Sequence, residues 1–108
     1  MTALRCDMDC VIVDETQDPE HAPNACGFRS ERPGLMHACG HDGHAAIGIG
    51  TAMLLRELRD QLHGTVRLIF QPAEEGVRGA SSIVAAGHLD DADYALAAHI
   101  FPAGKAAG

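Results

Sequence analysis

The sequence has few basic residues, no tryptophan and no long apolar run, and these absences disfavour several classes of protein. Lysine and arginine total 8 against 15 aspartate and glutamate residues, which gives a formal net charge of −7. Phosphate neutralisation requires a basic surface, so nucleic-acid binding becomes a minor alternative. No run of about 18 uncharged apolar residues occurs, and acidic residues stand where a signal peptide would be apolar. The sequence therefore predicts a soluble, cytoplasmic protein that binds neither nucleic acid nor membrane.

Cysteine usage argues against a small disulfide scaffold. The chain has 108 residues and four cysteines, Cys6, Cys10, Cys26 and Cys39. Because it also has ample Val, Ile, Leu and Ala for a core and no export signal, we expect all four to be reduced. Cys6, Cys10 and Cys26 are interpreted as small, buried or half-buried hydrophobic residues. A thiol redox function for Cys6 and Cys10 is disfavoured because no Cys-x-x-Cys pair occurs.

Hydrophobic patterning predicts one α/β domain. Apolar and β-branched runs predict strands at 2–8, 65–70 and 93–100, and helical spacing predicts helices at 42–61 and 80–86. Residues 14–34 form a long predicted loop, and the tail at 103–108 is expected to fray. The apolar positions of the longer helix are Ala45, Ile49, Ala52, Met53, Leu55, Leu58 and Leu62. Alternating strands and helices are typical of a three-layer αβα fold with a largely parallel, twisted sheet.

The nine residues MHACGHDGH at the start of the longer helix carry the first chemical signal. They contain His37, Cys39, His41, Asp42 and His44. Imidazole and thiolate together suit Zn, Mn, Co or Ni, and ligands one residue apart, such as Cys39 and His41, can converge on one ion. The alternative is a polar helix N-terminus, in which Asp42 supports the dipole and the histidines are solvated. The density of ligand-type side chains in this segment favours the metal site.

Two further signals follow the later strands. Glu74 and Glu75 come directly after the strand at 65–70, and His99 lies at the end of the last predicted strand. Neighbouring side chains on extended backbone point to opposite sides, so one carboxylate can bind a metal while the other takes a proton from its water. An exposed acidic turn and a core histidine are the alternatives. Together the three clusters supply the donors of a transition-metal site with a spare carboxylate beside it.

The strings MHACGHDGH, GTVRLIFQPAEEG and AAHI resemble the amidohydrolase branch of the aminoacylase/carboxypeptidase G-type metallopeptidases. The opening ALRCDMD adds to the resemblance, and Gly27-Phe28 ahead of MHACGHDGH most resembles the large-subunit group of aminobenzoyl-glutamate hydrolases. The resemblance implies hydrolysis of a small-molecule N-acyl or aminobenzoyl (aroyl) amino acid by two divalent ions, Mn or Zn, with Co or Ni as alternatives. It implies the metal ligands Cys39, His41, Glu75 and His99 and the general base Glu74. Asp9 and Asp42 are expected to orient ligands.

The resemblance covers only a central part of such an enzyme. Residues 1–108 are therefore predicted to be a partial catalytic, metal-binding domain without the inserted dimerisation domain of the family, and a homo-oligomer or a companion chain is expected. The family's proline is missing after Asp9, where the sequence reads Cys10-Val11-Ile12. No clamp for a substrate carboxylate is evident, because Arg5, Arg56, Arg59 and Arg67 are interpreted as strand-edge or solvated residues. A non-catalytic metal-binding remnant or subunit is kept as the alternative function.

Overall fold

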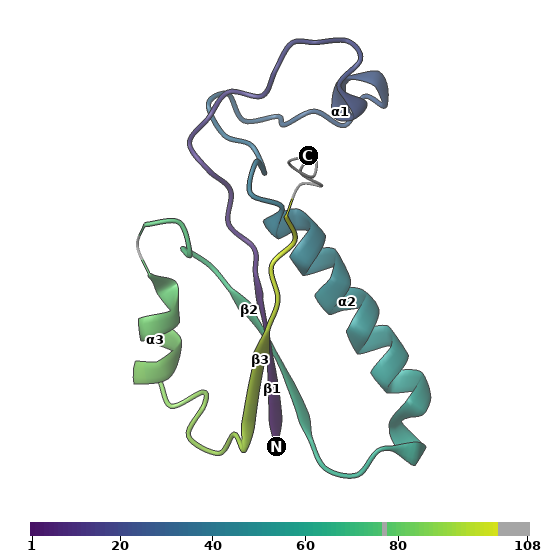
Figure 1. Ribbon diagram of the computed structural model, residues 1–108, viewed down its shortest axis with the longest axis vertical. Coiled ribbons are helices and arrows are strands. Elements are labelled where there is room, and N and C mark those ends of the chain that lie inside the picture. The colour runs from purple at the N-terminus through teal and green to yellow at the C-terminus, as the bar shows by residue number, and fades with distance from the viewer. Residues whose placement is uncertain (77, 102–108) are drawn as a thin grey trace, which may run out of the picture.

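The computed structural model describes residues 1–76 and 78–101, which form one sheet, helices that flank it and a long loop beyond it (Figure 1). The strands are β1 (Thr2–Asp7), β2 (Val66–Gln71) and β3 (Tyr94–Ala97). The helices are α1 (Ala22–Ala25), α2 (His41–Leu58) and α3 (Gly79–Ala85), and a 3₁₀-helix, η1 (Arg59–Gln61), extends α2. Within the described residues, no helix has the length and apolar character that crossing a membrane requires.

The order of the elements is as predicted, and their bounds differ at a few places. The long helix begins at His41, one residue earlier than predicted, and its last turn tightens into η1. The last strand ends at Ala97, so His99 lies beyond the strand rather than at its end. The predicted loop at 14–34 contains the short helix α1, which has a proline in its first turn. The tail predicted to fray lies outside the described residues.

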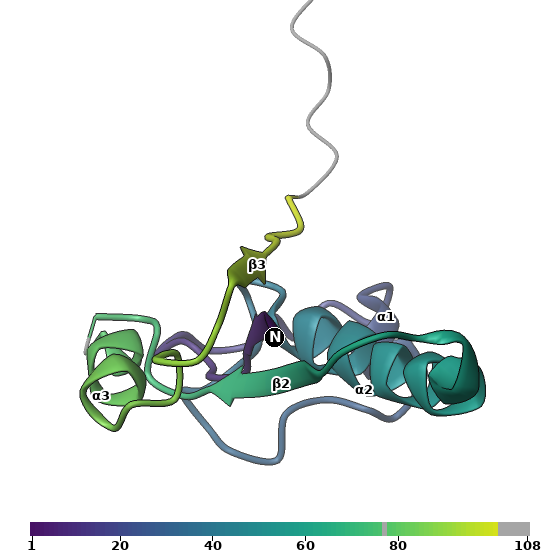
Figure 2. The ribbon, with the colours of Figure 1, turned by 90° about the horizontal axis from the view of Figure 1, so that it is seen from below.

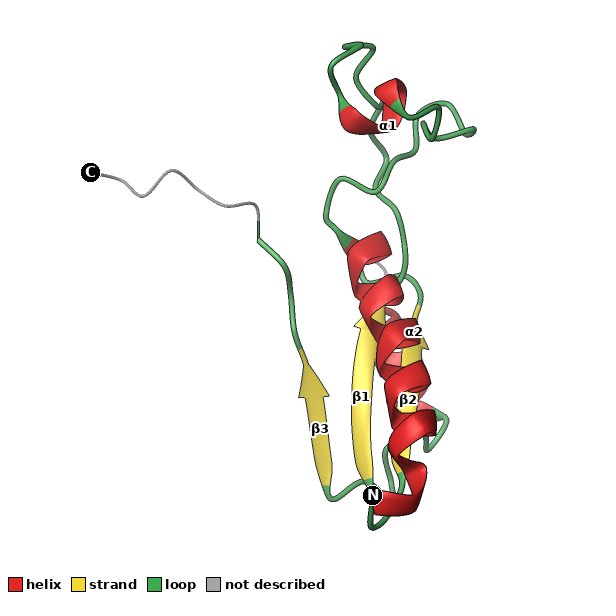
Figure 3. Ribbon diagram, turned by 90° about the vertical axis from the view of Figure 1, so that its right-hand side faces the viewer, coloured by secondary structure: helices red, strands yellow, loops and turns green. Residues whose placement is uncertain are grey.

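The three strands form one parallel sheet in the order β2-β1-β3. β1 is central, because Thr2 pairs with Val66 on one side and with Tyr94 on the other. α2 and α3 lie on opposite faces of the sheet (Figure 2), and α2 begins beside the carboxyl ends of the strands (Figure 3). The predicted α/β fold with a parallel sheet is confirmed. Side chains from the strand ends and from the start of α2 therefore meet at one edge of the sheet.

A narrow stripe of small and polar residues joins α2 to the sheet. The buried residues of this helix are His41, His44 and Gly48. A Cβ at Gly48 would stand 2.8 Å from Cys6 Sγ and 2.9 Å from Phe70 Cε1, so the close approach of helix and sheet requires glycine. The stripe places the two histidines against the carboxyl end of the sheet.

The predicted apolar face of α2 is only partly the face that packs. Ala45, Ala52 and Leu55 are half-buried, whereas Ile49, Met53, Leu58 and Leu62 are exposed. The physical reason is that α2 carries apolar residues on more than one side, so hydrophobic spacing alone does not fix its rotation about its own axis. Hydrogen bonds from His41 and His44 to residues at the end of β1 turn these two histidines inward.

The interior of the described part of the chain is small and largely polar. Its buried hydrophobic residues are Ala3 and Cys6, and its largest fully buried side chains are His41, Gln71 and Asp7. All four cysteines are free, as predicted. The interpretation of Cys26 as a covered residue was wrong, because Cys26 ends the four-residue α1 in the long loop and is exposed.

The long loop at residues 12–35 is ordered by its own polar contacts. Val11 and Met36 pair as an antiparallel bridge at its base. The buried carboxylate of Glu15 accepts the Ser30 N–H at 2.6 Å and lies 3.0 Å from His21 Nε2. The Ser30 N–H and the neighbouring His21 hold the pKa of Glu15 below its ordinary value, although burial opposes them. Glu15 is therefore the anchor of this loop.

Candidate metal centre

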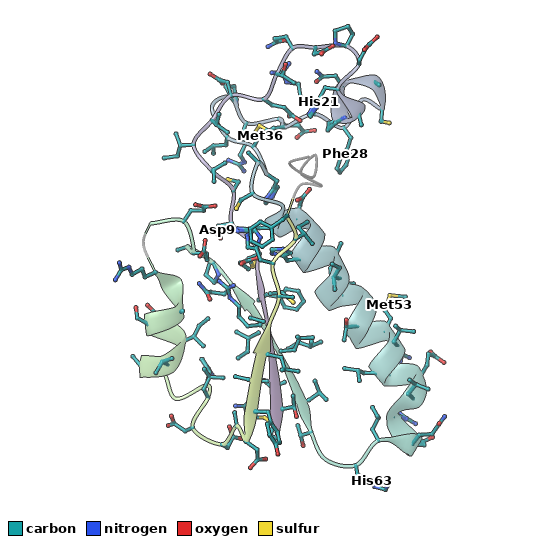
Figure 4. All side chains as sticks on the ribbon, in the orientation of Figure 1. Asp9, His21, Phe28, Met36, Met53 and His63 are labelled. Atoms are coloured by element: carbon teal, nitrogen blue, oxygen red, sulfur yellow. The ribbon has the colours of Figure 1, made fainter. Side chains whose placement is uncertain are left out.

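The carboxyl edge of the sheet gathers the predicted metal ligands and the predicted base, close to Asp9 (Figure 4). Ligand atoms of Cys39, His41 and His99 lie within 4.8 Å of one another, and so do those of His41, Glu74 and Glu75. Cys39 and His41 stand at the start of α2, the two glutamates follow β2, and His99 follows β3. His41 belongs to both groups and joins them into one cluster.

His41 is the fully buried centre of this cluster. Its Nδ1 lies 3.0 Å from the backbone carbonyl of Asp9, and because a carbonyl only accepts hydrogen bonds, Nδ1 donates and Nε2 carries the lone pair. Among the described residues Nε2 has no hydrogen-bond partner, while carboxylate oxygens of Asp7, Glu74 and Glu75 stand 3.7, 3.9 and 3.9 Å away. A buried lone pair that faces three carboxylates is costly unless a cation lies between them.

Asp9 connects His41 to the loop after β2. Its Oδ1 lies 3.1 Å from His41 Nδ1, and its Oδ2 accepts the Glu75 N–H at 2.9 Å. Burial acts to raise the pKa of Asp9, but the backbone N–H donors of Glu75 and Glu74 and the His41 ring hold it below its ordinary value. Asp9 therefore has the contacts that a ligand-orienting role requires, even without the family's proline after it.

Glu74 and Glu75 approach His41 from the same direction. Each has a carboxylate oxygen 3.9 Å from His41 Nε2, and their side chains are 41% and 34% exposed. The prediction that they point to opposite sides was wrong, because the backbone there is not extended. Ala73 has a φ of 55°, and the chain turns at Glu75. The two carboxylates are equivalent in their distance to His41, so their division into ligand and base stays a prediction.

Cys39 and His99 meet at the open side of the cluster, with Cys39 Sγ 3.4 Å from His99 Nε2. His99 Nδ1 donates to the Ile100 carbonyl at 2.6 Å, which leaves the Nε2 lone pair directed toward Cys39. The Glu75 carboxylate, burial and the Glu74 charge raise the pKa of Cys39 above its ordinary value. A divalent cation would reverse this effect, because a metal stabilises the thiolate.

The donor set and its spacing fit a transition-metal ion. Thiolate, imidazole and carboxylate together suit Zn, Mn, Co or Ni better than Ca or Mg. Two ligands of one ion with bonds of about 2.0–2.3 Å stand about 3.3–3.8 Å apart in tetrahedral geometry. The distance of 3.4 Å between Cys39 and His99 lies within that range, and the distance of 3.9 Å between His41 and Glu75 is close to it. A cation would also give the unpaired His41 Nε2 a partner.

A chain of buried hydrogen bonds lies directly beneath the metal cluster. Asp7 Oδ1 accepts a hydrogen bond from His44 Nδ1, and Asp7 Oδ2 accepts one from Arg5 Nη1 at 2.7 Å. Arg5 Nε donates to Gln71 Oε1 at 2.7 Å. Burial acts to raise the pKa of Asp7, but the hydrogen bond from His44 and the Arg5 charge hold it below its ordinary value. We call Arg5, Asp7, His44 and Gln71 the polar chain.

The polar chain is a hydrogen-bond network rather than a second ion site. Ligand atoms of Asp7, His41 and His44 do lie within 4.8 Å of one another. However, His44 Nε2 already accepts the Ile100 N–H at 2.8 Å, and its Nδ1 is bonded to Asp7. Because both nitrogens of His44 are occupied, this ring has no lone pair to offer a metal.

Comparison with known proteins identifies the family. The model of peptidase family M20/M25/M40 matches residues 3–108. The chain belongs to this family. Over 98 residues it is 56% identical to a Haemophilus influenzae homolog of one p-aminobenzoyl-glutamate hydrolase subunit and to the indole-3-acetyl-aspartic acid hydrolase of Enterobacter agglomerans. These matches cover 91% of this chain and 23% and 22% of the two relatives.

A solved M20 structure has the same fold over nearly the whole chain. It is a Bacillus subtilis protein described as a dinuclear metal-binding peptidase from the M20 family, with a TM-score of 0.82 and 44% sequence identity. The match covers 94% of this chain and 26% of that one. The resemblance found in the sequence is therefore confirmed, and the chain spans about a quarter of the length of the M20 relatives it matches.

Other sequence candidates in this M20/M25/M40 chain lie outside the cluster. Asp42 is exposed in the first turn of α2, where its negative charge interacts favourably with the helix dipole. It contributes no atom to the groups of candidate metal ligands. Its predicted ligand-orienting role stays a prediction. His37 is exposed as well. Arg67 is only partly exposed, and it pairs with Asp91 at 2.6 Å.

Sequence reasoning missed the polar chain. The interpretation of Arg5 as a strand-edge or solvated residue was wrong, because it is half-buried between Asp7 and Gln71. Spacing offered a signal: Arg5 and Asp7 are two residues apart on a strand and share a face. His41 and His44 are three residues apart on a helix, and residues at that spacing share one face of the helix.

Proposed function

We propose that this chain forms the metal-binding part of an amidohydrolase that cleaves N-acyl or aminobenzoyl amino acids. The observation that carries the proposal is the buried, unpartnered His41 Nε2, which faces the carboxylates of Asp7, Glu74 and Glu75. Membership of peptidase family M20/M25/M40 supports amide-bond hydrolysis. The description of the Bacillus subtilis neighbour as dinuclear supports a pair of divalent ions.

Each residue of the cluster has a proposed task. Cys39, His41, Glu75 and His99 would hold the ions, which when bound would supply Lewis-acid chemistry at the amide carbonyl and at a water molecule. Glu74, which is open to solvent, would accept a proton from the attacking water and return it to the leaving amine. Asp9 keeps Nε2 of His41 turned toward the site. Mn or Zn is proposed as the metal, with Co or Ni as alternatives that the same donors accept.

The proposed substrate is an amino acid whose nitrogen carries an acyl or aroyl group. The two bacterial relatives are named for aminobenzoyl-glutamate and for indole-3-acetyl-aspartic acid, and both names describe such an amide. The chain is equally similar to both over 98 residues, at 56% identity. This part of the protein is therefore proposed to carry the shared hydrolytic chemistry, while residues elsewhere select the acyl group.

The proposed partners and location follow from the relatives and the cysteines. The name of the Haemophilus relative describes one subunit of a hydrolase, which supports a companion chain, with a homo-oligomer as the other arrangement. Four free cysteines suit a reducing compartment and support a cytoplasmic location. The activity is proposed for a protein that contains residues 1–108 as a partial catalytic domain, with the inserted dimerisation domain outside them.

Metal analysis tests whether the site exists. The purified chain, loaded with Mn, Zn, Co or Ni and desalted, is expected to retain the metal stoichiometrically. Cys39→Ser combined with His41→Ala removes two donors, so this double variant is expected to retain none. Equal retention by the parent and the double variant would contradict the proposed site.

A panel of N-acyl and aminobenzoyl amino acids tests the reaction. The assay should use both the 108-residue chain and any longer product of the same gene, with release of free amino acid as the measurement. Hydrolysis that depends on added metal supports the amidohydrolase. A protein that binds metal and cleaves no member of the panel favours the alternative, a non-catalytic metal-binding subunit, because four donors can hold an ion without completing an active site.

A further inference from the structure

His44 is buried beneath the metal cluster and has no task among the proposed metal ligands. Its Nε2 accepts the Ile100 N–H at 2.8 Å. Because a backbone N–H only donates, Nε2 must carry the lone pair, and the hydrogen sits on Nδ1, which donates to Asp7 Oδ1. The ring is therefore fixed in one tautomer between the end of β1 and the segment that follows β3.

Ile100 is attached to α2 by its backbone and by its side chain. The N–H donates to His44, as described. The side chain lies against the first turn of the helix, where a Cβ at Gly40 or Gly43 would stand 2.7 or 2.9 Å from Ile100 Cδ1. Since β3 ends at Ala97, these contacts hold the chain after the last pairing with β1.

Ile100 is bonded to His99 through the backbone and contacts its ring. The nitrogen that donates to His44 is the one that forms the peptide bond with His99. The carbonyl of Ile100 accepts from His99 Nδ1 at 2.6 Å, which leaves Nε2 directed at Cys39 Sγ, 3.4 Å away. The His99 ring also lies edge-on against the His44 ring, with 4.6 Å between the ring centroids.

We propose that His44 is a positioning residue of the metal site: by accepting the Ile100 N–H, it holds His99 where Nε2 can bind an ion together with Cys39. Asp7, held in turn by Arg5, keeps His44 in the tautomer that can accept this hydrogen bond. The inference rests on the proposed metal site. The competing explanation is that His44 only fills buried space and pairs with Asp7, with no influence on His99.

Two substitutions of His44 separate these explanations. His44→Gln places an amide oxygen near the position of Nε2 and keeps an acceptor for Ile100. His44→Asn places an amide NH₂ near the position of Nδ1 and keeps a donor for Asp7 but no acceptor for Ile100. His37→Asn, at the exposed histidine of the same segment, is the matched control. The measurements are Co²⁺ affinity by chelator competition and the visible spectrum of the Co²⁺-loaded full chain.

His44→Asn is expected to weaken Co²⁺ binding by about tenfold or more, the usual effect of losing an outer contact to a ligand, and to give the spectrum of His99→Ala. His44→Gln and His37→Asn are expected to stay within about threefold of the parent, which is less than such a loss normally causes. Parent-like affinity in His44→Asn would overturn the proposal. The proposal would also be overturned if His44→Gln bound Co²⁺ as weakly as His44→Asn, because an acceptor for the Ile100 N–H would then make no difference to the affinity.

Two further measurements keep the test decisive if a variant is less stable. In the His99→Ala background, His44→Asn is expected to cause no additional loss of Co²⁺ affinity, and a full additional loss would contradict action through His99. Hydrogen exchange of the Ile100 amide needs no metal. The exchange rate is expected to be faster in His44→Asn than in His44→Gln. Equal rates would contradict the proposal that the hydrogen bond from the Ile100 N–H to residue 44 holds this segment. A parent protein that binds no metal would refute the proposed function, while the exchange comparison would still test whether His44 holds the Ile100 N–H.

Discussion

Glu74 and Glu75 are neighbours at the same distance from His41, but their proposed roles predict different losses on substitution. Loss of the proposed base, Glu74, should lower turnover, whereas loss of the proposed ligand, Glu75, should lower metal binding. In a protein with full activity, Glu74→Gln is expected to lower turnover by about a hundredfold or more with the metal content intact, because it removes only the proton acceptor. Glu75→Gln is expected to lose metal first. Turnover assays and metal analysis on both variants check this assignment. The reverse pattern would exchange the two roles.

Asp9 is expected to control metal affinity without binding the metal. Asp9→Ala removes the carboxylate that contacts the His41 ring and the Glu75 N–H, although the backbone carbonyl still accepts from His41 Nδ1, so affinity for Zn²⁺ should fall by about 10-fold. Asp14→Ala is a suitable control, because Asp14 accepts the Gly34 N–H in the long loop. Chelator competition measures both variants. An unchanged affinity in Asp9→Ala would show that other contacts orient His41.

Asp7 is expected to make the free energy of unfolding depend on pH in the acid range. Its pKa is held below the ordinary value of 3.8 in the folded protein, so the stabilisation is present above that value and is lost as the pH falls through the folded pKa. The difference in unfolding free energy between the metal-free parent and Asp7→Asn should therefore be largest above about pH 4 and shrink below it. Urea unfolding at several pH values measures it. A difference that stays constant down to about pH 2.5 would contradict the expectation.

At the scale of the elements, two glycines of α2 give opposite predictions. Gly48→Ala pushes a methyl group into Cys6 and Phe70 and is expected to destabilise the protein by about 1–3 kcal/mol. Apart from the backbone of its own helix, a Cβ at Gly50 would meet no atom of the described residues within 4 Å, so Gly50→Ala is expected to stabilise the protein by about 0.5–1 kcal/mol through helix propensity. Urea unfolding compares the two variants. Equal effects would mean that α2 does not approach the sheet at Gly48.

The elements themselves were largely predictable, because each one is encoded by a local pattern. The β-branched run before Gln71 and the helical spacing after Asp42 are properties of neighbouring residues. The rotation of α2 was not predictable in this way, because it depends on hydrogen bonds to Asp7 and Asp9, which lie more than 30 residues earlier. The early end of β3 has the same cause, since Ile100 is bonded to His44 rather than to β1.

At the scale of the whole molecule, the metal cluster could be predicted from composition and the polar chain could not. Cys39 and His41 sit in a short segment so rich in ligand-type residues that chance is a poor explanation. Gln71 and Arg5 carry no such local signal, and only the parallel pairing of β1 with β2 brings them together. The family resemblance singled out the candidate ligands, whose role stays a prediction, whereas the residues that contact them could be found only from the fold.

A protein consisting of residues 1–108 alone is expected to bind metal and to hydrolyse N-acyl amino acids poorly. The described residues offer candidate donors and a proposed base, but Arg5, the arginine directly beneath the cluster, is already bonded to Asp7 and Gln71, and small misplacements of a substrate are costly. We also expect concentration-dependent association, because Tyr94 and Leu96 are exposed on the edge strand β3. Sedimentation of the parent and of Leu96→Lys checks the second point, and an amino-acid release assay checks the first. Fast, metal-dependent hydrolysis by this chain would show that a clamp is present after all.

The central position of β1 has a consequence for synthesis on the ribosome. Within this sheet β1 is made before both strands that pair with it, and the first of these partners, β2, is complete about 60 residues later, which takes about 3–12 s at ordinary rates of translation. Its other neighbour, β3, arrives later still, and His99 follows it. Nascent β1 therefore lacks both of its partners in this sheet during this interval, and the candidate donors described here are not all present until His99 has emerged after β3. Chaperone binding to the nascent chain should accordingly be strongest during this interval.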